Sequence, residues 1–291
     1  MSHQLFRLTQ SIWNKPHLIT PQAFDVVLNY LDYRNGLYHK LIIQDSEDSV
    51  DIPEPSPDDL DDFDESSLPV AVINVSGSLT YKPVMTMCGE VGTSYESLED
   101  QVEDAIEDGA TTIVLNFASG GGEAAHAFET ADNIRNMCTE AGVALLGYAD
   151  EYACSAAYLL AVVCDELYAN PSATLGSIGC VVALLDTSKA MEMEGYKRVF
   201  ITSGTNKVPF DLDGSFKESF LEEIQVSVDK LNAQFTDHVA KYTGIDPQVI
   251  RDFEASCFDA EDSLANNLIS GIMTNKEFVQ YVVSKQGAPN A

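Results

Sequence analysis

The chain has 291 residues, of which 45% are hydrophobic, so it is long enough to bury the core of one or two globular domains. Its 46 acidic residues far outnumber its 16 basic residues, and the formal net charge is -30 at pH 7. This charge argues against nucleic acid and anionic membranes as partners, because clusters of Lys and Arg bind phosphate groups. No secretory signal or membrane span is visible, and no CxxC pair indicates a metal site.

The N-terminal part of the chain divides into two segments. Residues 1–43 predict a small helical segment, because Thr20 and Pro21 are typical of an N-cap and a first helical position and the apolar residues that follow recur at helical spacing. Residues 44–67 are dense in acid and proline, which predicts a disordered linker. An alternative interpretation is an acidic segment that covers a basic site.

The sequence pattern of residues 68–285 predicts an α/β domain, and residues 286–291 are expected to form a flexible tail. Runs of β-branched and apolar residues predict strands over residues 70–77, 111–117, 143–149, part of 166–171, part of 174–186, and 197–204. Helices are predicted over residues 95–108, 154–164 and 214–242, and a further helix follows the glycines within residues 119–138. Because strands alternate with helices, we expect parallel strand pairing with right-handed crossovers.

A glycine run and a serine stand at the ends of two predicted strands. Residues 119–122 (SGGG) follow the strand at 111–117, and we interpret them as a sharp turn before a helix, with N–H groups that could hold an oxyanion or a phosphate. Ser155 begins the helix at 154–164 between small residues, which leaves room for a peptide backbone. By itself, Ser155 is better explained as a simple helix cap than as a catalytic residue.

A lysine follows the last predicted strand. Lys207 lies among neutral polar residues, and burial would lower the pKa of its amine enough for it to accept a proton from a serine. The alternative is a lysine on a surface turn, which is the usual environment of this residue.

The order of these stretches resembles the signal-peptide peptidase A family of serine peptidases, peptidase family S49. That family typically shows S-P-G-G after a strand, then A-S-G-G-Y, then N-P-x-x-x-x-G-S-I-G, and then S-G-x-x-K. The corresponding stretches here are residues 118–121, 154–158, 170–179 and 203–207. The resemblance covers roughly residues 68–285, and its most specific part is ANPSATLGSIG (169–179).

The resemblance implies a fold and a mechanism. The fold would be α/β, a ClpP/crotonase-like ββα superhelical spiral that carries the small helical N-terminal segment. Ser155 would be the nucleophile of a serine endopeptidase, and Lys207, in its neutral form, would be the general base. The backbone N–H groups of Gly120 and Gly121 would form the oxyanion hole, and Ser177 would orient the lysine. The family implies no metal and no cofactor.

The sequence departs from the family pattern at three positions, and it resembles one branch most. Ser119 replaces a proline, and Ala156 and Ala157 replace two glycines, but the side chains stay small, so we expect catalysis to survive. The leader at residues 14–21 is similar to that of phage capsid-maturation proteases. This branch implies a homo-oligomer inside the phage procapsid or virion, in the host cytoplasm, that cleaves scaffold, capsid or portal proteins.

Other interpretations remain open. A Ser-His-Asp peptidase needs a histidine between Ser155 and Lys207, where the chain has none; His126 and His238 lie on predicted helices, and we expect His238 on the surface. Cys154 could be the nucleophile, although an apolar setting predicts an inert thiol. A crotonase that binds acyl-coenzyme A needs basic residues. A non-catalytic scaffold or shell-binding protein is the alternative from another functional class.

Overall fold

The computed structural model describes residues 17–20, 70–86, 89–90, 92–197, 199–211 and 213–286. The helix expected after Thr20, the acidic segment 44–67 and the tail after residue 286 therefore lie outside the described residues. Within the described part, residues 17–19 are a short strand rather than part of a helix. No helix in this part of the chain is long and apolar enough to cross a membrane.

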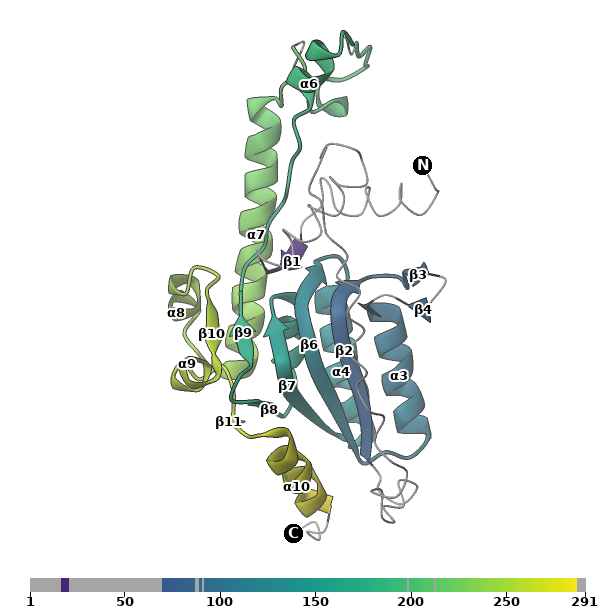
Figure 1. Cartoon of the computed structure of the whole chain (residues 1–291), viewed down its shortest axis with the longest axis vertical. Coiled ribbons are helices and arrows are strands. Elements are labelled where there is room, and N and C mark those ends of the chain that lie inside the picture. The colour runs from purple at the N-terminus through teal and green to yellow at the C-terminus, as the bar shows by residue number, and fades with distance from the viewer. Residues whose placement is uncertain are drawn as a thin grey trace, which may run out of the picture.

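A mostly parallel sheet forms the centre of the molecule (Figure 1). Its long strands are β2 (Val70–Thr80), β6 (Thr112–Glu123) and β7 (Ala144–Cys154), and β8 (Glu166–Ala169) is the next along the chain. Each of these strands pairs in parallel with the next, as the alternation of strands and helices predicts.

Shorter strands complete this sheet, and two others form a separate pair. They are β1 (His17–Ile19), β5 (Thr93–Ser94), β9 (Thr174–Gly176), β10 (Cys257–Asp259) and β11 (Gly271–Ile272) in the main sheet, and β3 (Met85–Thr86) with β4 (Gly89–Glu90) as a separate pair.

Helices cover both faces of the sheet. One face packs against α3 (Tyr95–Glu107), α4 (Ala127–Ala141) and α5 (Ala156–Ala161), which contribute to the main buried core. The other face packs against α10 (Asn275–Gln286), whose Phe278 and Val282 form a second apolar cluster with residues of β6, β7 and β8. The remaining C-terminal helices are α7 (Glu218–Thr243), α8 (Pro247–Asp252) and α9 (Ala260–Ala265).

Strand β7 takes part in two different pairings. Residues 146–149 pair with β8, whereas residues 152–154 pair with β9. One pass of the chain through the sheet therefore contributes two strand segments and a helix, which is the ββα unit. The predicted α/β class, with parallel strands that alternate with helices, is confirmed.

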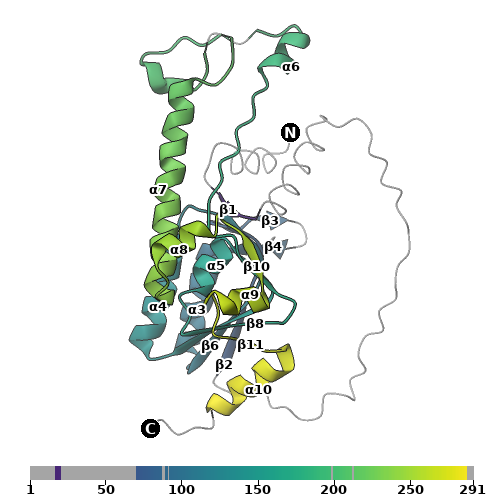
Figure 2. The ribbon, with the colours of Figure 1, turned by 90° about the vertical axis from the view of Figure 1, so that its left-hand side faces the viewer.

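A long excursion leaves the sheet after β9, and we call its residues 181–227 the arm. The chain extends away from the sheet to α6 (Ser188–Met193), passes through the short 3-10 helix η3 (Thr205–Lys207), and returns along the first half of α7 (Figures 1 and 2). The predicted strand at 197–204 is wrong: the described residues of this stretch, 197 and 199–204, form no strand, and Ile201 is 98% exposed. Its β-branched residues therefore form surface.

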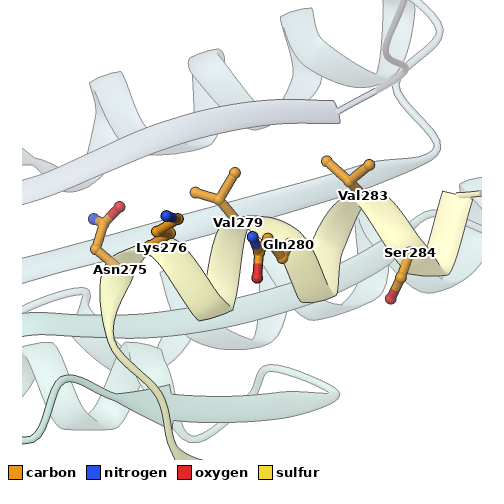
Figure 3. A pocket seen from close by; sticks show the side chains of 6 residues that line it. All are labelled: Asn275, Lys276, Val279, Gln280, Val283 and Ser284. Atoms are coloured by element: carbon orange, nitrogen blue, oxygen red, sulfur yellow. The ribbon is translucent and has the colours of Figure 1, made fainter.

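A shallow hollow lies along the outer side of α10. Val279 and Val283 are exposed there, with polar side chains between and beside them (Figure 3). The residues that line the hollow are Asn275, Lys276, Val279, Gln280, Val283 and Ser284. None of these residues is among those that the sequence nominates for catalysis, and α10 covers the face of the sheet that is opposite α5.

Candidate active site

The glycine run continues a strand. The turn expected at residues 119–122 is wrong, because β6 runs through to Glu123 and pairs Gly121 with Ser78 and Gly122 with Leu79 of β2. Ser119 stabilises this stretch, since its Oγ donates to the Gly77 carbonyl oxygen at 2.6 Å and accepts from the Gly121 N–H at 3.2 Å.

Close approach of other backbones explains why these positions are glycine. Gly121 has φ +103°, and an ideal Cβ there would lie 2.1 Å from the Leu18 carbonyl oxygen and 3.0 Å from the Cβ of Ser155. An ideal Cβ on Gly122 would lie 1.9 Å from the Leu79 carbonyl oxygen. The structure thus brings the glycine strand and Ser155 together, although they are far apart in sequence.

Ser155 is held in an unusual backbone conformation between β7 and α5. Its φ of 55° and ψ of −118° are costly for a residue with a side chain, and such strain is concentrated at functional sites. Its side chain does not cap α5, which removes the simple helix-cap interpretation. The Oγ donates to the Gly179 carbonyl oxygen at 3.4 Å, and the residue is fully buried.

The two remaining predicted site residues, Ser177 and Lys207, lie in different parts of the structure. Ser177 is buried and directly follows Gly176, whose carbonyl oxygen accepts the Ser155 N–H at 2.8 Å. Lys207 is exposed in η3 on the arm, where the neighbouring Asn206 contacts Glu223 of α7. No hydrogen bond or ion pair joins Lys207 to Ser155 or Ser177 among the described residues, so a single chain in this conformation does not assemble the predicted serine–lysine pair.

Two thiols meet beside the serine, and the sequence reasoning missed the second of them. Strand β9 lies between β7 and β10, and Gly176 pairs with Cys154 on one side and with Cys257 on the other. Hydrogen bonds from Cys154 and then from Ser177 lower the pKa of the exposed Cys257 thiol to about 7. The pKa of Cys154 is raised, first by its hydrogen bond to Cys257 and then by burial, so this thiol stays protonated.

Alkylation measures this difference between the cysteines. Because the thiolate is the reactive form and dominates above the pKa, we expect iodoacetamide to modify Cys257 with a half-maximal rate near pH 7. Cys154→Ala removes the hydrogen bond that contributes most to the lowered pKa, and should therefore move this midpoint upward. Peptide mass spectrometry over a pH series gives both values, with Cys164, whose pKa burial raises, as the unreactive internal control.

Equal midpoints for Cys257 in the unmodified and Cys154→Ala chains would contradict the thiol contact.

The two histidines weighed against the lysine do not reach the serine. His238 is buried, contrary to the surface position predicted for it, and its Nε2 lies 3.2 Å from the Leu159 carbonyl oxygen. Burial lowers the pKa of His238 and keeps its ring neutral. The ring of His126 stacks on Tyr81, with 3.7 Å between the ring centroids. No group of three or more His, Cys, Asp or Glu side chains within the described residues could hold a metal ion.

Comparison with known proteins places this geometry in context. The sequence profile of peptidase family S49 matches residues 139–287, about half of the chain. The capsid assembly protease C of Escherichia phage lambda is 28% identical over 215 residues, which are 72% of this chain and 48% of that protein. The head-tail preconnector protein GP5 of Enterobacteria phage P21 is 24% identical over 216 residues, 74% of this chain and 43% of that protein.

The chain spans about half the length, or less, of these two curated relatives. Among solved structures, a mutant of ClpP1 from Listeria monocytogenes aligns over 71% of this chain and 92% of its own, with a TM-score of 0.44 and 10% sequence identity.

Proposed function

Because the chain belongs to peptidase family S49, we propose that it is a serine endopeptidase that acts in phage head maturation, with Ser155 as the nucleophile. The observation that carries the proposal is the strained and uncapped conformation of Ser155 against the glycine strand. The names of the lambda and P21 relatives support a capsid role. Its substrates would be scaffold, capsid or portal proteins inside the procapsid, within the host cytoplasm.

The proposed chemistry is acyl transfer. The Oγ of Ser155 attacks the carbonyl carbon of a peptide bond while its proton passes to the neutral amine of Lys207. The tetrahedral oxyanion is stabilised by N–H groups of Gly120 and Gly121, and the lysine then gives its proton to the departing amine. Water releases the acyl group by the same steps, and Ser177 orients the lysine.

The arm supports an oligomeric site. It carries many exposed large apolar side chains, and the surface of a monomeric protein rarely shows such a concentration. These residues are Val181, Leu185, Met193, Tyr196, Val199, Phe200, Ile201, Leu221 and Val226. Helix α7, with 26 residues and a length of about 39 Å, holds this surface away from the sheet (Figure 2). The proposed assembly is therefore a homo-oligomer in which the arm of one copy brings Lys207 to Ser155 of its neighbour.

A mixing experiment tests whether the dyad is shared between copies. Ser155→Ala and Lys207→Ala chains should each be inactive, and an equimolar mixture, dissociated and reassembled, should recover about a quarter of the unmodified activity. The fraction follows because a site then needs its serine from one variant and its lysine from the other, each present at one half. The readout is cleavage of a casein-like substrate.

The control is the Ser155→Ala/Lys207→Ala double variant mixed with either single variant, which should stay inactive. A Ser155→Ala and Lys207→Ala mixture that is no more active than its components would place the base within the same chain, or outside Lys207. Cleavage that survives Lys207→Ala alone would identify a different base.

A further inference from the structure

Strand β1, from the leader segment at residues 17–20, is hydrogen-bonded on both of its edges. On one side it runs antiparallel to the glycine strand, pairing Leu18 with Gly122, and the Thr20 N–H donates to the Gly120 carbonyl oxygen at 2.9 Å. On the other side the backbone of His17 exchanges two hydrogen bonds with Val181, at 2.8 and 2.9 Å. The segment is thus an inner strand although it is only three residues long.

The slot that this strand fills opens next to the proposed nucleophile. Strand β7 pairs with β6 only as far as Ala153 and Ser119, and then turns into α5 at Ser155. Strand β6 continues to Glu123, so its edge beyond Ser119 would have no partner from β7. The gap between this edge and Val181 is one strand wide, because a single strand bonds to both.

The backbone of the leader segment lies against the reacting groups. The position of an ideal Cβ on Gly121 is 2.1 Å from the Leu18 carbonyl oxygen and 3.0 Å from the Ser155 Cβ, so these two atoms are no more than about 5 Å apart. Leu18 and Ser155 are both fully buried. A peptide carbonyl of the chain itself therefore lies close to both the glycine strand and the serine, and the buried serine is closed to an external polypeptide in this conformation.

We propose that residues 17–20 are an internal occupant of the substrate groove, an inhibitory strand that must leave before a protein substrate can bind. The groove takes an extended polypeptide, held by main-chain hydrogen bonds to Gly120–Glu123 on one edge and to Val181 on the other, in the manner of strand addition. The inference rests on the proposed role of Ser155. Val181 is also the first residue of the arm, so a movement of the arm would act directly on the bonds that hold the leader.

A peptide-binding experiment in a Ser155→Ala background tests whether residues 17–20 occupy the substrate groove, and it does not require catalysis. Thr20→Pro removes the N–H that donates to Gly120, whereas the matched Thr20→Ser keeps both the N–H and a hydroxyl. The probe is a fluorescent peptide with the sequence of residues 14–22, followed by anisotropy. We expect Thr20→Pro to bind it about tenfold more tightly than Thr20→Ser, because loss of a buried backbone hydrogen bond shifts the leader out of the groove.

Equal affinity of the two variants for the peptide would overturn the inference. So would a Thr20→Pro chain that no longer melts cooperatively, because β1 would then be a required part of the fold. Hydrogen exchange on the otherwise unmodified chain gives an independent reading: the Val181 amide, which is bonded to His17, should exchange by local opening and much faster than the Phe117 amide in the core. Equal protection of the two amides would also overturn the inference.

Labelling with a fluorophosphonate, carried out on the assembled oligomer so that Lys207 can reach Ser155, separates this inference from the proposed function. With Ser155 intact, the Thr20→Pro chain should react several-fold faster than the Thr20→Ser chain, because more of its serine is open. Tighter peptide binding with no labelling of either chain would keep the inhibitory strand and refute Ser155 as the nucleophile. Equal labelling rates with equal peptide binding would refute the strand and keep the nucleophile.

Discussion

Replacing Ser155 with alanine is expected to lower the rate of protein cleavage at least about a thousandfold, because covalent catalysis has no substitute once its nucleophile is lost. The fold should survive the change. Among the described residues, the Ser155 hydroxyl makes one long hydrogen bond, to the Gly179 carbonyl oxygen at 3.4 Å, and it does not cap α5. The measurement is digestion of a casein-like protein or a candidate scaffold by assembled chains, with circular dichroism to compare the melting of each chain.

Ser263→Ala is the matched control for this prediction. Ser263 is also fully buried, and its Oγ has no hydrogen-bond partner within the described residues, so its replacement should change neither cleavage nor folding. Cleavage by the Ser155→Ala chain at the rate of the unmodified chain would refute the proposed nucleophile. Absence of cleavage by every chain, once assembly is demonstrated, would favour the non-catalytic scaffold or shell-binding role.

Gly122→Ala is expected to destabilise the fold by about 3 kcal/mol or more, which corresponds to a fall of roughly 10 °C in the melting temperature. An ideal Cβ on Gly122 lies 1.9 Å from the carbonyl oxygen and 2.6 Å from the nitrogen of Leu79, and both atoms are backbone. Relief would require β2 and β6 to separate in the middle of the sheet. Thermal and urea unfolding, followed by circular dichroism, measure the loss.

Gly147→Ala distinguishes a backbone clash from a general intolerance of added volume. Gly147 is also a buried glycine of a central strand, but its ideal Cβ meets first the Cδ1 of Leu167 at 2.8 Å, the end of a side chain that can rotate. We expect a loss of about 1 kcal/mol there. Equal losses at the two glycines would mean that β2 and β6 do not approach as closely at Gly122 as the register indicates.

Several elements follow from short-range patterns in the sequence. The predicted ranges agree to within one residue with the starts of two strands, at Val70 and Thr112, and with the helix Tyr95–Glu107. β-Branched runs and helical spacing are local properties of the sequence, and each places apolar side chains on the face that the core buries. The order of the glycine run, Ser155 and the GSIG stretch also indicated the family, and the family profile covers half of the chain.

Other features of the structure could not be predicted from short-range sequence patterns. Glycines at 120–122 read as a turn because glycine usually marks one, but here they permit β6 to pass close to Leu18, Leu79 and Ser155. The apolar run at 197–204 has strand propensity, yet its described residues, 197 and 199–204, join no sheet. His238 was expected on the surface, but the packing of α7 against α5 buries it.

The sequence by itself determined the α/β class, the central strands and the stretch that holds Ser155. Each of these depends on the pattern of apolar and small residues within a short segment, and that pattern can be read without knowing which segments pack together. Only the tertiary structure decided that Cys154 and Cys257 lie on either side of Gly176, that the leader segment pairs with the glycine strand beside Ser155, and that Lys207 lies apart on the arm. These contacts join segments far apart in the chain. They depend on which strand edges pair and in which register, and residue order alone does not specify that choice.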